Sequence, residues 1–173
     1  MAGVNFLLRD YQSSDFDTLW SIDQECFAPG IAYSQREMGH YIRQPGSFTL
    51  VAEASPTRTK QASGSGADGP ASRILGFLVM QTRRDVGHLI TIDVRPETQR
   101  SGIGSKLLRA AEERLLTLSC RRLYLETAVD NLPAIAFYQR HQYFVVRTVP
   151  GYYFNGVDAL ILEKDLLSVR HAS

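Results

Sequence analysis

Apolar residues along the chain follow two spacings, which alternate from one segment to the next. Short apolar runs, or apolar residues at every second position, predict strands over residues 4–9, 48–54, 74–81, 88–94, 121–127, 143–149 and 157–164. Spacings of three and four residues predict helices over residues 13–26, 34–43, 102–118 and 132–142. Ser13 or Ser14 is expected to cap the first of them. This alternation predicts an α/β fold, with a sheet of about seven strands between helices.

The longest predicted helix carries one apolar stripe, which we expect to pack on the sheet. The members of the stripe are Ile103, Leu107, Leu108, Ala111, Leu115 and Leu118. The sequence contains no internal repeat and no Pro-rich stretch between two separate apolar segments. Residues 1–173 are therefore predicted to form one domain.

Residues 55–72 differ from the rest of the chain in their high content of Gly, Ser, Pro and Thr. Such a segment buries too little apolar surface to order itself, so we predict a flexible hairpin loop. Arg58, Lys60 and Arg73 suggest a basic docking arm as the alternative. Isolated charges in a segment of this composition are more typical of a soluble linker, which we favour. We expect deletion of the loop to leave catalysis intact.

The overall composition is that of an ordinary globular protein, with 44% hydrophobic residues and a net charge of +1. This balance favours neither nucleic acid nor an anionic membrane as a partner. Cys26 and Cys120 belong to no Cys/His cluster, so neither a metal site nor a disulfide is predicted. No signal peptide or apolar run of membrane-spanning length is recognised. We expect a cytoplasmic monomer or homodimer.

Residues 90–108 (ITIDVRPETQRSGIGSKLL) combine an apolar strand, a turn with a proline, and a glycine-rich helix start. Gly102 and Gly104 have no side chains that would block a close approach, and the first-turn N–H groups of a helix can bind an anion. A nucleoside triphosphate loop would require Gly-Lys-Ser/Thr, and a dinucleotide fingerprint would require a third glycine. Neither is present, so the segment predicts a pyrophosphate cradle of another kind. A pair of glycines that only relieves crowding is the alternative.

Four motifs together resemble the GNAT acetyltransferases. Residues 99–104 (QRSGIG) match the acetyl-CoA signature, and residues 123–127 (LYLET), 131–138 (NLPAIAFY) and 151–160 (GYYFNGVDAL) follow in the order and spacing of that superfamily. Within it they look most like protein N-terminal acetyltransferases, including the RimI type. The resemblance implies the GNAT fold, in which a mixed, mostly antiparallel sheet has splayed central strands. It also implies acetyl-CoA as cosubstrate and no metal.

The resemblance further implies which residues contact the cofactor. Pantetheine would bond to backbone groups of the strand that holds Ile92, Asp93 and Val94. The pyrophosphate would be surrounded by the turn and helix start, and two further contacts would come from the next helix. These residues are Arg100, Ser101, Gly102, Ile103, Gly104, Ser105, Asn131 and Tyr138. Asn131 is also placed to cap its helix, and the two roles are compatible.

The transfer needs an amine without its proton and a group that protonates the departing thiolate. Near neutral pH roughly a quarter of an α-amine is neutral, against about a thousandth of a lysine. By resemblance to RimI-type enzymes, Glu126 is the base, directly or through water, and Tyr138 is the acid. The alternative for Glu126 is a salt bridge with Arg121, Arg122 or Arg147. The alternative for Tyr138 is a core aromatic residue.

Asp93 interrupts an otherwise apolar strand, where side chains alternate in direction. Asp93 therefore faces away from Ile92 and Val94. A catalytic carboxylate is one interpretation, because some GNAT enzymes place a base on this strand. We favour a structural or water-holding role with a partner, because an unpaired buried carboxylate is costly.

Two loops resemble the acceptor pocket of protein N-terminal acetyltransferases. Phe27, Pro29, Ile31 and Tyr33 would form one wall, and Tyr152 with Tyr153 the other, although loop packing explains either segment equally well. Residues 29–33 (PGIAY) look nearer to enzymes of methionine-first peptides than to the Pro-Trp-Ser of RimI. The resemblance thus implies a protein or peptide N-terminus with a small or medium apolar first residue. Acetylation of a small amine or lysine side chain is the alternative within catalysis, and a CoA-binding regulator is the alternative outside it.

Overall fold

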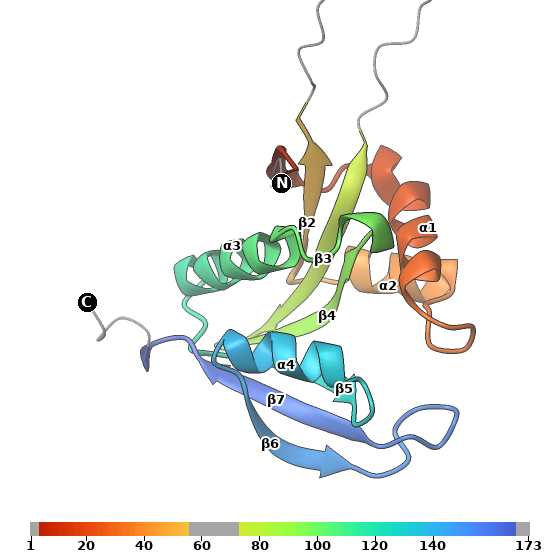
Figure 1. Cartoon of the computed structure of the whole chain (residues 1–173). Coiled ribbons are helices and arrows are strands. Elements are labelled where there is room, and N and C mark those ends of the chain that lie inside the picture. Colours follow the sequence, from red (N-terminus) through yellow and green to blue (C-terminus); the bar gives the residue numbers. More distant parts are fainter. Residues whose placement is uncertain (1–3, 56–72, 169–173) are drawn as a thin grey trace, which may run out of the picture.

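The computed structural model describes residues 4–55 and 73–168, which contain seven strands in one sheet (Figure 1). The sheet order is β1-β2-β3-β4-β5-β7-β6. The strands are β1 (Phe6–Asp10), β2 (Ser47–Ala54), β3 (Ile74–Arg83), β4 (Val86–Val94), β5 (Arg122–Ala128), β6 (Phe144–Val149) and β7 (Ala159–Asp165). The α-helices are α1 (Phe16–Cys26), α2 (Gln35–Arg43), α3 (Ile103–Thr117) and α4 (Leu132–Arg140).

The sheet is mixed, because β4 and β5 run parallel while every other neighbouring pair is antiparallel. The parallel pairing extends only from Val86 to His88 on β4 and from Arg122 to Tyr124 on β5. Beyond these residues the two strands diverge, and Figure 1 shows the sheet opening between β4 and β5. The predicted sheet with splayed central strands is confirmed.

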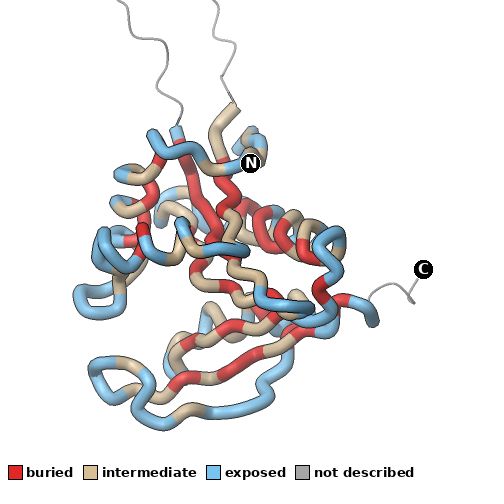
Figure 2. Tube along the Cα trace, turned by 180° about the vertical axis from the view of Figure 1, so that it is seen from behind, coloured by how far each residue is buried: buried red, intermediate tan, exposed pale blue. Residues whose placement is uncertain are grey.

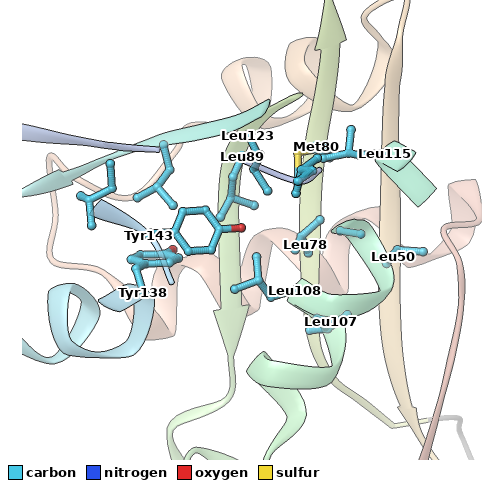
Figure 3. Packing of buried hydrophobic residues seen from close by; sticks show 14 of the residues in the cluster. Leu50, Leu78, Met80, Leu89, Leu107, Leu108, Leu115, Leu123, Tyr138 and Tyr143 are labelled. Carbon is cyan, nitrogen blue, oxygen red and sulfur yellow. The ribbon is translucent and has the colours of Figure 1, made fainter. Parts of the chain in front are cut away.

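Helices cover both faces of the sheet, and each face has its own apolar core. Helices α1 and α2 lie on one side and α3 on the other (Figure 1). The α3 side holds Leu50, Leu78, Met80, Leu107, Leu108, Leu115 and Tyr143, among others (Figure 3). The α1 side holds Leu19, Ile22, Met38, Val51, Ile74, Phe77 and Val79. The central strand β3 is buried on both faces, whereas the loops are mostly exposed (Figure 2).

The apolar stripe of α3 is buried as predicted, with one exception. Ile103, Leu107, Leu108, Ala111 and Leu115 are all buried. The expected stripe member Leu118 is 51% exposed. The helix ends at Thr117, and the following Ser119 adopts a positive φ of 62°, so the chain turns away before residue 118 reaches the sheet.

The start of the first helical region differs from the prediction that Ser13 or Ser14 caps it. Residues Ser13–Asp15 form a 3-10 turn, and the buried Asp15 closes it by accepting a hydrogen bond of 2.8 Å from the Gln12 N–H. Asp15 also pairs with Arg9 at 2.7 Å, so a tertiary ion pair replaces a local serine cap. Helix α2, in contrast, begins with a true cap, in which Ser34 Oγ accepts a hydrogen bond from the Glu37 N–H.

The predicted loop over 55–72 lies outside the described residues except for Ser55. Of its three basic residues only Arg73 is described, and its guanidinium is 2.5 Å from Glu97. In residues 4–55 and 73–168, none of the helices combines the length and the apolar character that a membrane crossing requires.

Candidate active site

The first turn of α3 presents backbone N–H groups that no side chain caps. Gly102 is the N-cap residue, with a left-handed φ of 86°, and it provides no side-chain hydrogen bond. By comparison, Asn131 Oδ1 caps α4 by accepting a hydrogen bond from the Ala134 N–H, as expected. Arg100, Ser101 and Gly102 are exposed around the turn. This open helix start suits the binding of an anion such as a pyrophosphate.

Strand β4 contains a bulge, after which odd-numbered and even-numbered side chains exchange the faces of the sheet to which they point. Thr91 pairs with Val79 and Leu89 pairs with Met80, which leaves Ile90 as the extra residue. After the bulge, Ile92 and Val94 pack against the core under α3. The side chain of Asp93 points to the other face of the sheet, as the alternation along a strand predicts. It is only 1% exposed.

The backbone carbonyl of Val94 is already engaged at the end of β4. It accepts hydrogen bonds from Gln99 Nε2 at 3.1 Å and from Cys26 Sγ at 3.3 Å. A pantetheine arm that uses this carbonyl would have to exchange partners with these two side chains. The thiol of Cys26 stays protonated at neutral pH, because burial raises its pKa to about 12.

Glu126 lies on β5, just beyond the point where β4 and β5 separate. Its Oε2 is 2.6 Å from Nε2 of His88 on β4, and the His88 ring stacks on Tyr124 with centroids 4.3 Å apart. In the described part of the chain, Glu126 has an ion-pair contact with His88 and with none of the expected partners Arg121, Arg122 and Arg147. Histidine takes that place because the β4–β5 register puts residue 88 beside residue 124.

His88 was not among the predicted site residues. In the sequence His88 stands at the start of a predicted strand, where nothing in the local pattern distinguishes it from a surface histidine. Its relation to Glu126 depends on the parallel pairing of two strands that are distant in sequence. Only the known strand order reveals this contact.

Tyr138 on α4 is a core residue with an unengaged hydroxyl. Its ring packs edge-on against that of Tyr143, with centroids 5.7 Å apart (Figure 3). It also packs edge-on against Phe137, with centroids 5.2 Å apart. Among the described residues, none forms a hydrogen bond with the Tyr138 hydroxyl, whereas the Tyr143 hydroxyl donates to Glu112 Oε1 at 2.7 Å. Burial raises the pKa of Tyr138 well above its ordinary value. Tyr138 therefore holds its proton at neutral pH.

The two predicted acceptor loops approach the same region. Burial raises the pKa of Tyr153 to about 12 and also raises that of Tyr152, and the charge of Glu126 contributes to both shifts. Tyr33 on the other loop has its pKa raised by burial, and Tyr41 and Tyr152 add to this shift. Tyr33 also packs edge-on against Tyr41, with centroids 5.4 Å apart. Tyr152 and Tyr153 of the second loop thus lie near Glu126, and Tyr33 of the first loop lies near Tyr152.

The remaining residues of the first loop differ in exposure. Phe27 is half-buried, Pro29 is exposed, and Ile31 is 40% exposed. A shallow surface depression of about 430 Å³ lies beside this loop, at the start of α2. Its lining consists of Ser34, Arg36, Glu37, His40 and Tyr41. Tyr41 connects this depression with the ring of Tyr33.

A family model described as the acetyltransferase (GNAT) family matches residues 16–143. An uncharacterized N-acetyltransferase of Methanocaldococcus jannaschii is 29% identical over 159 residues, which cover 91% of this chain and 90% of that protein. An N-alpha-acetyltransferase of Saccharolobus solfataricus is 36% identical over 81 residues, 46% of this chain and 48% of that protein. The match thus spans about half the length of the Saccharolobus relative.

Solved structures with similar folds include further acetyltransferases. The ribosomal-protein-S18-alanine N-acetyltransferase of Escherichia coli superposes with a TM-score of 0.76 at 20% identity, covering 93% of this chain and 94% of that chain. NAA60 of Arabidopsis thaliana in complex with acetyl-CoA has a TM-score of 0.75 at 21% identity, covering 93% and 98%. At such identities these similarities concern the fold.

Proposed function

The chain belongs to the GNAT family of acetyltransferases and is an acetyl-CoA-dependent N-acetyltransferase, and we propose that its acceptor is the N-terminal α-amine of a protein or peptide. A relative from Saccharolobus solfataricus is named an N-alpha-acetyltransferase, which supports this class of acceptor. A small or medium apolar first residue, methionine included, fits the apolar loop residues Phe27 and Ile31.

The observation that carries the proposal is the position of Glu126. Its carboxylate lies at the separation of β4 and β5, held by His88 and close to Tyr152 and Tyr153. In the proposed complex, tyrosine hydroxyls on this wall bind the backbone of an acceptor peptide. The first residue of the peptide lies against the opposite loop, which contains Tyr33. The α-amine is then directed toward Glu126.

The chemistry that an α-amine requires is modest. Its ordinary pKa of about 8 leaves a substantial neutral fraction near pH 7, so the base needs only to remove the proton released on attack. Glu126 takes up that proton, either directly or through water, as the new C–N bond forms. The C–S bond then breaks, and Tyr138 donates its hydroxyl proton to the departing sulfur. One proton has then left the amine and one proton has reached the thiol. Exchange with solvent then returns Glu126 to its ionised form and Tyr138 to its protonated form.

The chain also offers groups that fit acetyl-CoA. The N–H groups of Ile103, Gly104 and Ser105 in the first turn of α3 would hold the pyrophosphate, with Arg100 beside them. Ile92 to Val94 border the gap beside β5 and would carry the pantetheine arm. When bound, acetyl-CoA supplies the activated acetyl group as a thioester.

The decisive experiment measures release of free thiol from acetyl-CoA with a panel of acceptors. The panel contains peptides with varied first residues, a peptide with a blocked N-terminus and a free lysine, and a polyamine. We expect turnover only with free peptide N-termini, and most with apolar first residues. Turnover only with the lysine peptide or the polyamine would reject the proposal.

The role of Glu126 is tested with Glu126→Gln. Removing the base should lower kcat at least about a hundredfold, while binding of CoA is unchanged. Glu113→Gln is the matched control, because Glu113 is an exposed carboxylate on α3 away from the gap. Equal activity of the two variants would remove Glu126 from the mechanism.

A further inference from the structure

Asp23 on α1 is a fully buried carboxyl group, with 0% of its surface exposed. Its Oδ2 accepts hydrogen bonds from the backbone N–H of Tyr33 at 2.8 Å and from Gln24 Nε2 at 3.0 Å. Its other oxygen, Oδ1, is buried and has no hydrogen-bond partner in the described part of the chain. Asp23 therefore holds the end of the acceptor loop and still has one unsatisfied oxygen.

Asp93 on β4 is buried in the same region, and it too has one oxygen without a hydrogen-bond partner among the described residues. Its Oδ1 accepts a hydrogen bond of 2.7 Å from Thr91 Oγ1, and its Oδ2 has no donor among the described residues. The carboxyl groups of Asp23 and Asp93 are close enough for each to shift the pKa of the other. Each carboxyl group thus retains one free oxygen, and the two groups are neighbours.

Two ionised carboxylates are not stable in this arrangement. Both are buried, and the charges would repel at short range. The guanidinium of Arg95, which lies just beyond β4, pairs with Glu25 at 2.9 Å instead. A single proton shared between the two carboxyl groups removes one charge and satisfies both free oxygens.

We propose that Asp93, in its neutral form, donates a hydrogen bond to ionised Asp23, and that this pair positions Tyr33 and the acceptor loop on β4. The inference rests on the proposed function, because it assigns the loop to acceptor binding. Asp23 and Asp93 are positioning residues, since they act through Tyr33. The pair links the strand assigned to the cofactor with the loop assigned to the acceptor.

The hydrogen-bond partners decide which group keeps the proton. Asp23 accepts two N–H bonds, which favour its ionised form, whereas Asp93 accepts only one hydroxyl bond. Burial raises the pKa of Asp23 to about 6, and it raises the pKa of Asp93 well above its ordinary value. The hydrogen bond between them lowers the first pKa and raises the second. At neutral pH the proton therefore stays on Asp93.

Other titratable groups near the pair do not change charge in the same pH range. Burial raises the pKa of Cys26, Tyr33 and Tyr138, so all three stay neutral. Glu37 on α2 adds negative charge that raises the pKa of Asp23, and the cap with Ser34 keeps Glu37 ionised by lowering its own pKa. Near pH 6, Asp23 is thus the group in this region whose charge changes.

The expected consequence is a dependence of acceptor binding on pH. Below about pH 6 neutral Asp23 accepts the Tyr33 N–H more weakly, because a hydrogen bond to a charged acceptor is the stronger one. The KM for the acceptor should rise as the pH falls through this range. The KM for acetyl-CoA should change less, because Tyr33 and Gln24, the donors that bind Asp23, lie outside the turn and the start of α3.

The first test is a titration of the aspartate carboxyl carbons by 13C NMR in the full chain, with Asp23→Asn and Asp93→Asn to assign the signals. We expect one carboxyl to titrate near pH 6 and the other to stay protonated at neutral pH. Titration of both signals near pH 4, the ordinary range, would overturn the inference. This measurement needs no substrate, so it remains decisive if the acceptor is not a peptide N-terminus.

The second test compares variants by the KM for the acceptor that is turned over. Asp93→Ala removes the donor and should raise this KM about tenfold, whereas Asp93→Asn keeps an N–H donor and should recover most of that loss. Asp23→Asn should abolish the rise in KM below pH 6. An equal KM for Asp93→Asn and Asp93→Ala would overturn the positioning role.

Discussion

The Nε2 atom of His88 lies 2.6 Å from Oε2 of Glu126, across the point where the parallel strands β4 and β5 separate. The contact orients one carboxylate oxygen and leaves the other available to an acceptor. The stacked ring of Tyr124 holds the imidazole in place. The candidate base is thus positioned by two strands together.

We expect His88→Ala to lower kcat/KM about tenfold, because Glu126 loses the group that orients it. His88→Gln retains an N–H donor and should recover most of the loss. Steady-state kinetics with the best acceptor of the panel measures both values. His40→Ala is the control, since His40 is an exposed histidine on α2. Activity of His88→Ala equal to that of the control would show that the contact has no catalytic role.

Tyr138→Phe should separate catalysis from stability. The hydroxyl forms no hydrogen bond within the described residues, so the free energy of unfolding should change by less than about 0.5 kcal/mol. The value of kcat should fall at least about tenfold, because the thiolate loses its proton donor.

Tyr143→Phe is the matched variant for this test. The Tyr143 hydroxyl donates to Glu112, so its removal should cost about 1 kcal/mol in urea unfolding and leave kcat unchanged. The reverse pattern, with Tyr143→Phe inactive and Tyr138→Phe active, would exclude Tyr138 as the acid.

Gly102→Ala should weaken CoA binding about tenfold, measured by calorimetry, because a Cβ at a left-handed position strains the turn that presents the α3 N–H groups. Gly30→Ala is the control, since Gly30 has a similar φ of 89° and open space around it. Both variants should lose similar stability, but only Gly102→Ala should lose CoA affinity. Equal affinities would place the pyrophosphate elsewhere.

Tyr152→Ala should raise the KM for an acceptor peptide about tenfold without changing the KM for acetyl-CoA, because it removes one aromatic wall near Glu126. Phe144→Ala provides the comparison, since Phe144 is an aromatic residue on β6 that is 70% exposed. A changed KM for acetyl-CoA in Tyr152→Ala would contradict the assignment of this loop to the acceptor.

Arg9→Met should reduce stability in a pH-dependent manner. Arg9 pairs with Asp15 at 2.7 Å and with Glu53 at 2.6 Å, and the first pair lowers the pKa of Asp15. A lowered folded-state pKa contributes stability above the unfolded value of about 4, and this contribution is lost as pH falls through the folded value. The variant should be less stable by about 1 kcal/mol at pH 7. Urea unfolding should show the difference shrinking as the pH falls below the unfolded value of about 4, and a constant difference would contradict the ion pair.

Local patterns in the sequence were sufficient for most of the secondary structure. The period of apolar residues predicted all seven strands and the four α-helices. The helix predicted from residue 34 matches the start of α2, where Ser34 and Glu37 form a capping box between residues three apart. Prediction failed at Ser13 and Ser14, where Arg9 on strand β1 engages Asp15, and at Leu118, where the helix ends early.

The sequence by itself determined the order of elements and the uncapped, glycine-rich start of α3, because helix period, capping and backbone freedom depend on near neighbours in the chain. The motif order likewise indicated the family before any contact was known. Only the tertiary structure decided that His88 meets Glu126, 38 residues away, and that Asp23 lies beside Asp93. Such contacts depend on strand register, on a bulge in β4 and on the packing of α1. These features are set by the whole sheet rather than by any local spacing of residues.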